Sequence, residues 1–294
     1  MGPEMTEWLA RTVHNDIIQI AEDAGVEVSL HAAIVGRPDL PSISVNPHRI
    51  TVAASLYKAV VMVAYCRMVD EGHIDPRERV IIHPGEKRGG RTGVSICLDE
   101  VEMSLRDIVR SMMTVSDDVA GRHLLQKVGL NAVNSTAAAL GLRSTEVTAN
   151  PDRPVGRHGG RAVTSSNDRL QEQLDPMLLS RTTAADMVTL VDSIWTNTAA
   201  STQQCAFMRE VLAQQVFRHR IASGFNYPGV TISAKTGSLA YYRHEAAVVE
   251  HAGELPIAIA VLTSSARRET ALPASDLAVG KFAFMIVTYL RQTL

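Results

Sequence analysis

The 294-residue chain has little that would mark a membrane protein or a nucleic-acid-binding protein. Its formal net charge is only −2, so no broad electrostatic field favours nucleic acid or an anionic membrane surface. No apolar run is long enough to cross a bilayer. Residues 1–5 (MGPEM) lack the basic start and apolar core of a secretion signal. We therefore expect no membrane or nucleic-acid partner, and a cytoplasmic location if no signal has been removed upstream.

Cysteine is scarce as well. Cys66, Cys97 and Cys205 are an odd number of thiols, widely spaced and without a CxxC pair. This spacing argues against a disulfide framework and against a zinc site, so we expect reduced, buried thiols, no metal and no other cofactor. The apolar content of 46% and charged content of 20% are those of an ordinary globular protein. The length suffices for one large domain or two moderate ones.

Apolar periodicity predicts strands at both ends of the chain and helices between them. The expected strands cover 26–35 and 42–45, then 231–236, 246–249 and 256–262, the last three as an antiparallel meander. Helices are expected at 6–24, 55–71, 104–113, 119–127, 131–140, 182–194, 202–212 and 274–290. Residues 84–93 predict an exposed loop without the order of a phosphate-binding loop, and 143–180 predict a long irregular segment.

These elements predict an α/β protein of the α+β kind, in which both chain ends build one antiparallel sheet flanked by helices. An all-helical domain is inserted between the strands. We place the sheet domain at 1–50 and 214–294 and the helical domain at 51–213.

The segment Ser55-Leu56-Tyr57-Lys58 opens a long apolar run that predicts a mostly buried helix. Ser55 and Lys58 are three residues apart, so they lie on one helix face, one turn from each other. A hydroxyl needs a base to become a nucleophile, and a desolvated lysine can be neutral enough to serve. The alternative is an N-cap serine followed by a lysine that reaches solvent.

Two further segments complete a pattern. Ser116-Asp117-Asp118 lies in a turn between helices, and Lys235-Thr236-Gly237 lies at the end of a strand. With Ser55-xx-Lys58, their order and separations resemble the SxxK, SDN and KTG signatures of class A serine β-lactamases and penicillin-binding proteins. The resemblance covers roughly residues 25–290 and implies the β-lactamase/transpeptidase-like fold.

The resemblance also implies roles for these residues. Ser55 would attack a carbonyl to give an acyl-enzyme, with Lys58 as general base or proton relay. Ser116 would pass a proton toward the leaving group, and Lys235 would hold a substrate carboxylate. The backbone N–H groups of Ser55 and Ser238 would form the oxyanion hole. Substrate contacts would come from residues near these motifs: Asp118, Thr236, Gly237 and Arg243. A solvated arginine at the strand edge is the alternative for the last of them.

Two departures from the family pattern bear on the activity. Asp118 stands where the family has Asn, and an ionised carboxylate accepts hydrogen bonds but donates none. It would favour a substrate group with N–H donors or a positive charge. The family's ExxLN motif is absent, and its nearest match, residues 171–175, puts Gln171 at the Glu position. Glu172 or Glu146 are candidate deacylation bases, with solvated loop charges as the alternative.

The sequence therefore leaves three functions open. The first is an intracellular or biosynthetic serine hydrolase of an amide, lactam or ester, with weak or no classical β-lactamase turnover. The second is a transacylase, DD-peptidase-like enzyme or esterase that uses the same acyl-enzyme. The third is a non-catalytic binding protein that retains the pocket. Each takes a small molecule with a carbonyl and a carboxylate as its partner, and the oligomeric state is left open.

Overall fold

The computed structural model describes residues 3–87, 90–149, 174–267 and 271–294. Both ends of the chain meet in one antiparallel sheet whose strand order is β2-β1-β9-β8-β7. The five strands are β1 (Val26–Ile34), β2 (Ser42–Val45), β7 (Val230–Leu239), β8 (Tyr242–His251) and β9 (Ile257–Ser265). The predicted α+β architecture is thus confirmed, including the meander of the last three strands.

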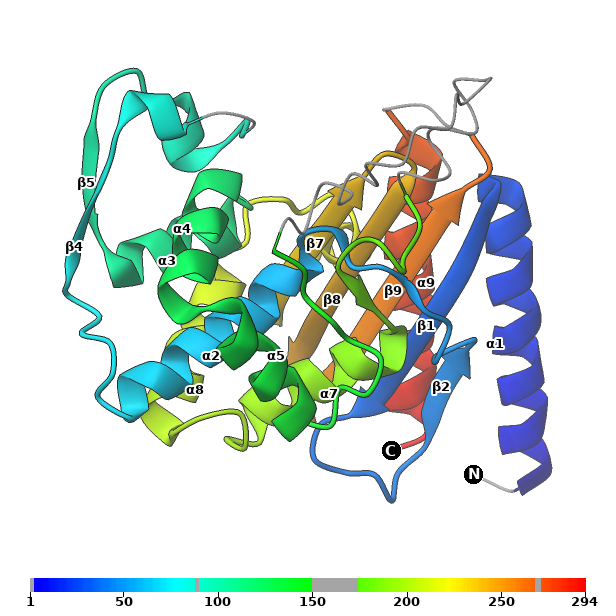
Figure 1. The fold of residues 1–294 in the computed structure, drawn as a ribbon. Helices are drawn as coiled ribbons and strands as arrows, with labels where there is room; N and C mark the ends of the chain where they lie inside the picture. Colours follow the sequence, from blue (N-terminus) through cyan, green and yellow to red (C-terminus); the bar gives the residue numbers. More distant parts are fainter. Residues whose placement is uncertain (1–2, 88–89, 150–173, 268–270) are drawn as a thin grey trace.

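Helices cover both faces of this sheet (Figure 1). On one face, the N-terminal helix α1 (Pro3–Ala24) and the C-terminal helix α9 (Pro273–Gln292) bury an apolar cluster that includes Ile17, Phe282 and Val249. A long amphipathic helix at each end of the chain is what the apolar spacing predicts.

The helical segment packs on the opposite face. Its α-helices are α2 (Tyr57–Asp70), α3 (Leu105–Thr114), α4 (Asp118–Val128), α5 (Leu130–Ala139), α7 (Ala184–Trp195) and α8 (Thr202–Ala213). Residues 57–66 of α2 are all buried, so this helix forms the centre of the second core cluster. Val248 and Ala260 from the sheet join that cluster, because α7 packs directly on the strands. The domain boundaries at 51 and 213 therefore stay a prediction.

Short elements that periodicity did not predict frame the helical segment. The strands β4 (Arg79–Ile82) and β5 (Val101–Ser104) form a hairpin-like pair, and β3 (Thr51–Val52) pairs with β6 (Arg181–Thr182). One-turn 3-10 helices occupy η1 (Ala54–Leu56), η2 (Pro84–Glu86), η3 (Gly93–Ile96) and η4 (Ile221–Gly224). Pairs this short have too few residues to show a period.

Three expectations need correction in detail. Lys235-Thr236-Gly237 does not end its strand, because β7 continues to Leu239 and Gly237 pairs with His244 of β8. Ser55 is not the N-cap of α2; it lies in η1, two residues before Tyr57, and Leu56 is the N-cap. Cys66 and Cys205 are buried free thiols, but Cys97 is exposed, because it follows η3 in a surface loop.

No described helix is long and apolar enough to cross a membrane. Within the described ranges, no three or more His, Cys, Asp or Glu side chains are grouped so that they could hold a metal ion.

Candidate active site

Ser55 lies on a constrained turn at the start of the buried helix. The preceding residue, Ala54, has φ of +44°, a backbone conformation that costs a non-glycine residue on the order of 1 kcal/mol. The turn is tied down at Ala53, whose N–H donates to the Ser180 carbonyl at 2.7 Å. Ser55 itself is 9% exposed. The fold therefore holds this serine on a rigid platform rather than on a free loop.

Lys58 follows one turn later and has no access to water. It is 0% exposed, so the alternative of a lysine that reaches solvent is wrong. Its Nζ donates to the Ser116 carbonyl at 2.8 Å and to Asp118 Oδ1 at 2.6 Å. A longer contact of 3.4 Å joins it to Ser116 Oγ. The helix that follows Ser55, α2, is thus linked to the turn between α3 and α4.

That turn has its own anchor, which the motif comparison did not single out. Asp117 is 0% exposed, and its carboxylate accepts N–H donors at the start of α4, as an N-cap does. It also accepts from Val94 N–H at 2.8 Å and from the Ser111 hydroxyl at 2.7 Å. The sequence signal was present, since Asp directly precedes the apolar start of α4. Asp117 fixes the turn so that Ser116, with φ of +56°, presents its hydroxyl to the lysines.

Lys235 reaches the same hydroxyl from the sheet. Its Nζ lies 3.0 Å from Ser116 Oγ and 2.6 Å from the Thr236 carbonyl oxygen. Burial lowers the pKa of Lys235 well below its usual value, and the nearby charges of Lys58 and Arg220 lower it further. We define Lys58, Ser116, Asp118 and Lys235 as the site cluster.

Gly237 lets the sheet lie close to the serine turn. A Cβ at this position would lie 3.2 Å from Leu56 Cγ and 3.3 Å from the Ala53 carbonyl oxygen. Contacts this short require the neighbour to move, so a side chain would push β7 away from η1. The glycine therefore sets the width of the gap between Ser55 and the β7 strand.

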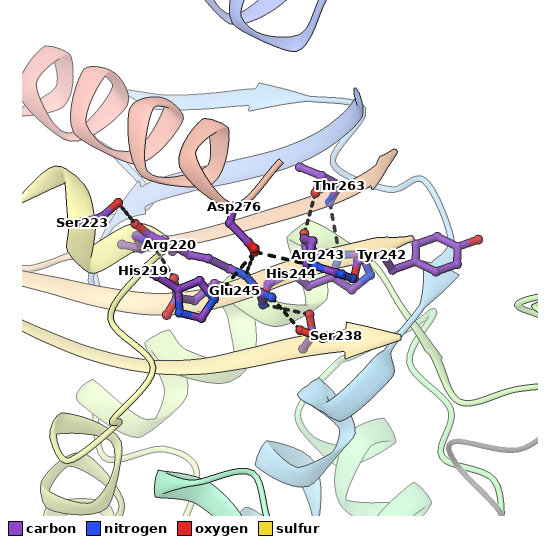
Figure 2. Close-up of polar contacts among 12 residues, drawn as sticks. His219, Arg220, Ser223, Ser238, Tyr242, Arg243, His244, Glu245, Thr263 and Asp276 are labelled. Carbon is purple, nitrogen blue, oxygen red and sulfur yellow. Dashed lines mark hydrogen bonds and ion pairs between the residues drawn. The ribbon is translucent and has the colours of Figure 1, made fainter. Parts of the chain in front are cut away.

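The opposite face of the same strand ends carries a second polar group, drawn in Figure 2. Arg220 is 2% exposed and donates to Asp276 Oδ1 at 2.7 Å and to Ser238 Oγ at 2.6 Å. It also donates to the backbone carbonyls of Gly237 and His244. No sequence argument found Arg220, because the segment between α8 and β7 shows no period. We define Arg220, Arg243, Glu245 and Asp276 as the arginine cluster.

Arg243 is not a solvated strand-edge arginine, since its side chain is only 8% exposed. It donates to the carbonyls of Ala240 and Tyr242 at 2.7 Å, and its Nε lies 3.8 Å from Asp276 (Figure 2). Ser238 is its partner in the β7–β8 register. A contact from Arg243 or the Ser238 N–H to a substrate stays a prediction.

Two ionisable neighbours on β8 have shifted pKa values of opposite kind. Burial raises the pKa of Glu245 to about 7, although the Ile221 N–H and Arg220 act against it. Burial lowers the pKa of His244 to about 4. His244 Nδ1 accepts from Thr263 N–H and its Nε2 donates to the Val52 carbonyl, because the backbone groups fix those roles. His244 thus links β8 to the strand that leads into η1.

Of the candidate deacylation bases, Glu146 lies in the described part of the chain and Glu172 does not. Gln171 also lies outside the described residues. Glu146 forms an ion pair with Arg181 at 2.5 Å, and the same two residues exchange backbone hydrogen bonds. Glu146 is therefore already matched with a cation in the described structure.

The chain is similar to known proteins over almost its whole length. A sequence model of the β-lactamase enzyme family matches residues 10–290, and the chain belongs to that family. The protein described as β-lactamase regulatory protein BlaB from Streptomyces cacaoi is 26% identical over 277 residues, covering 85% of this chain and 89% of its own length.

Solved structures of similar fold come from both branches of the resemblance. A β-lactamase from Sphaerobacter thermophilus superposes with a TM-score of 0.79 at 24% identity, over 95% of this chain and 97% of that one. PBP-A superposes with a TM-score of 0.77 at 17% identity, over 97% and 96%. At these identities the likeness concerns the fold, and it confirms the class A β-lactamase and penicillin-binding-protein resemblance.

Proposed function

We propose that this protein is a serine hydrolase that forms an acyl-enzyme on Ser55 with an amide, lactam or ester. The observation that carries the proposal is the convergence of two buried lysines, Lys58 and Lys235, on the Ser116 hydroxyl. A lysine pair around one hydroxyl is costly to bury, and it is useful where protons must move. Family membership supports the same reaction class.

In this proposal Ser55 attacks the carbonyl carbon, and the site cluster takes its proton and returns one to the leaving group. The backbone N–H groups of Ser55 and Ser238 would stabilise the oxyanion, where loss of one donor typically costs about 3 kcal/mol. The substrate is a small molecule whose carboxylate would lie against the Lys235 side chain and the positive charge of Arg243. Thr236 and Gly237 would line its binding site.

What happens to the acyl-enzyme distinguishes a hydrolase from a transacylase. Without the family Glu, deacylation would fall to Glu172 or to a water activated within the site cluster. We propose slow turnover of classical β-lactams and an intracellular role, such as a biosynthetic hydrolysis. A transacylase, DD-peptidase-like enzyme or esterase would use the same intermediate with a different acceptor.

Intact-protein mass spectrometry after exposure to a chromogenic β-lactam or an activated ester tests the proposal. Wild type should gain the mass of one acyl group, and Ser55→Ala should gain none. A burst of chromophore should precede a slower steady state, because acylation outruns deacylation. An equal adduct on Ser55→Ala, or no adduct with any acylating compound, would contradict the proposal.

A second candidate is a non-catalytic binding or regulatory protein that retains the pocket. Two observations favour it: the similar Streptomyces cacaoi protein is described as a regulatory protein, and Asp118 engages Lys58 in an ion pair. In that case ligand affinity should be the same in wild type, Ser55→Ala and Lys58→Ala, and no acyl compound should be turned over. Calorimetric titration of these three proteins with a β-lactam separates the two candidates.

A further inference from the structure

We propose that Asp118 holds Lys58 in its protonated form and that Lys235 is the amine of the site that accepts a proton, taking it from Ser116. This assignment rests on the proposed acyl-enzyme function and reverses the roles that the motif resemblance implies for the two lysines. The hydrogen-bond partners of the two Nζ atoms differ in the way that this assignment requires.

Three groups lie around Lys58 Nζ. Two of them can only accept hydrogen bonds, and the third, the Ser116 hydroxyl, can either donate or accept. The Ser116 carbonyl and the ionised Asp118 carboxylate have no proton to donate, so Nζ must donate to both. The 2.6 Å separation from Asp118 Oδ1 is as short as charge-assisted hydrogen bonds are. The side chain is fully buried, so no water replaces these partners. An ammonium satisfies this arrangement with its three N–H groups.

Lys235 has a different set of neighbours. It has no ion pair with a carboxylate in the described part of the chain, and its two hydrogen-bond partners are the Thr236 carbonyl and the Ser116 hydroxyl. Burial lowers the pKa of Lys235, and the nearby charges of Lys58 on α2 and Arg220 before η4 lower it further. Asp118 and Glu245 act against this effect but do not prevail.

The Ser116 hydroxyl has the right number of sites to connect the two lysines. It can donate one hydrogen bond and accept two. The Lys58 ammonium donates to Ser116 Oγ, and Ser116 donates its own proton to the lone pair of a neutral Lys235, whose N–H groups serve the Thr236 carbonyl. The three N–H groups of the Lys58 ammonium and the Ser116 proton then each have an acceptor.

The proton balance of acylation follows. Ser55 Oγ forms a bond to the carbonyl carbon while its proton passes to Ser116 Oγ and the Ser116 proton passes to Lys235 Nζ. When the bond to the leaving nitrogen or oxygen breaks, Lys235 returns a proton through Ser116 to that atom. Lys58 stays a cation throughout and supplies only electrostatic stabilisation.

This assignment also changes the part played by Asp118. The sequence led us to expect a carboxylate facing a cationic or N–H-bearing substrate group. Paired with Lys58, Asp118 already has its cation, so its principal partner is a lysine of the site. It acts as a positioning residue that decides which lysine carries the proton.

The chain has only five lysines, so their Nζ signals can be assigned one by one with Lys→Arg variants. We expect heteronuclear NMR of ¹⁵Nζ-labelled protein to show Lys235 changing from ammonium to amine as pH rises, while Lys58 stays an ammonium over the same range. In Asp118→Asn, which removes the counter-charge, Lys58 should titrate within that range. Lys58 losing its proton before Lys235 in wild type, or both staying charged throughout, would overturn the assignment.

Acylation rates give the second readout. Lys235→Arg keeps a positive charge but cannot accept a proton at any working pH, so acylation should fall at least about 100-fold. Lys127→Arg, on the exposed face of α4, is the matched control and should acylate as wild type does. A Lys235→Arg rate within a few-fold of wild type would contradict the proposal. If wild type forms no adduct, the proposed function fails, and the NMR titration still decides the charge of each lysine.

Discussion

Two largely buried polar clusters lie on opposite faces of the β7–β8 strand ends, and each combines two basic side chains with one ion-paired carboxylate. The site cluster has Lys58 and Lys235 with Asp118, and its hydrogen bonds converge on one hydroxyl. The arginine cluster has two guanidinium groups that share Asp276, and its hydrogen bonds spread over the backbone. The two clusters therefore have similar compositions but different hydrogen-bond arrangements.

The chemistry of the cations explains the difference. Arginine stays charged at all working pH values and offers several fixed donors, so it suits the permanent bracing of strand ends. Lysine is a single charge that can lose its proton when buried, so it suits proton movement. Asp276 adds to the bracing because it lies in the first turn of α9, where a negative charge is favourable. The arginine cluster on one face of the strands stabilises the backbone, and the site cluster on the other face has groups that can transfer protons.

The largest effect on stability should come from breaking the arginine cluster with Arg220→Lys. Lysine has three donors on one atom and cannot reach Asp276, the Ser238 hydroxyl and two carbonyls together. Buried acceptors would be left without partners, so the free energy of unfolding should fall by about 2–4 kcal/mol. Urea denaturation followed by circular dichroism measures this change.

Arg37→Lys is the control for that substitution. Arg37 pairs with Asp39 at the surface, where both side chains are exposed and a change of cation should leave the denaturation midpoint nearly as it was. Equal midpoint shifts in the two variants would mean that the donors of Arg220 do not brace the strands.

A smaller, pH-dependent effect should come from Glu245→Gln. The pKa of Glu245 is raised to about 7 in the folded protein, so the folded state binds more protons than the unfolded state between about pH 4.5 and 7. Stability from this group is present at low pH and is lost as pH rises through 7. The glutamine variant should therefore gain about 3 kcal/mol relative to wild type between pH 4.5 and 7.

The buried His244 contributes a pH dependence of stability with the opposite sign, so the two groups can be told apart. Its pKa is lowered to about 4, so its contribution to stability is present above about pH 6.5 and is lost as pH falls toward 4. In wild type the two slopes oppose each other between about pH 4.5 and 6.5. Glu245→Gln should uncover the His244 slope, seen as stability that rises with pH in urea denaturation series. A constant difference between variant and wild type at all pH values would contradict the raised pKa of Glu245, and a variant whose stability does not rise between about pH 4.5 and 6.5 would contradict the lowered pKa of His244.

Much of this arrangement could be predicted from the sequence, because long periodic segments and ordered motifs carry most of the signal. The strands at both chain ends and the buried helix that follows Ser55 are predicted by apolar spacing. The order of the three motifs identified the family, and both Lys58 and Lys235 do lie within hydrogen-bond reach of Ser116.

What could not be predicted depends on contacts between distant segments. The ion pair of Asp118 with Lys58 joins residues 60 positions apart, and the sequence around either residue does not predict it. Arg220 reaches Asp276 across 56 positions from a stretch without any period. The positive φ values of Ala54 and Ser116 could not be predicted from the sequence either, because both residue types ordinarily avoid the left-handed region.

The smallest effect on stability should come from Gly121→Ala, which disturbs the site cluster alone. A Cβ at Gly121 would lie 3.1 Å from Lys58 Cε and 3.2 Å from the Tyr57 hydroxyl oxygen. The lysine must therefore move by a few tenths of an ångström. Relief of the helical glycine cost, about 0.5–1 kcal/mol, offsets part of the crowding, so the free energy of unfolding should change by no more than about 1 kcal/mol.

Acylation should nevertheless slow about 3- to 10-fold, because the displacement moves the Lys58 Nζ atom relative to Asp118 and Ser116. Acylation kinetics by intact mass and the Nζ signal of Lys58 are the two measurements, with the Lys127 signal as internal reference. A normal rate together with a shifted Lys58 signal would show that the exact place of this ammonium is unimportant. A slower rate with intact stability would show that the site cluster depends on tenths of an ångström that the arginine cluster on the other face does not share.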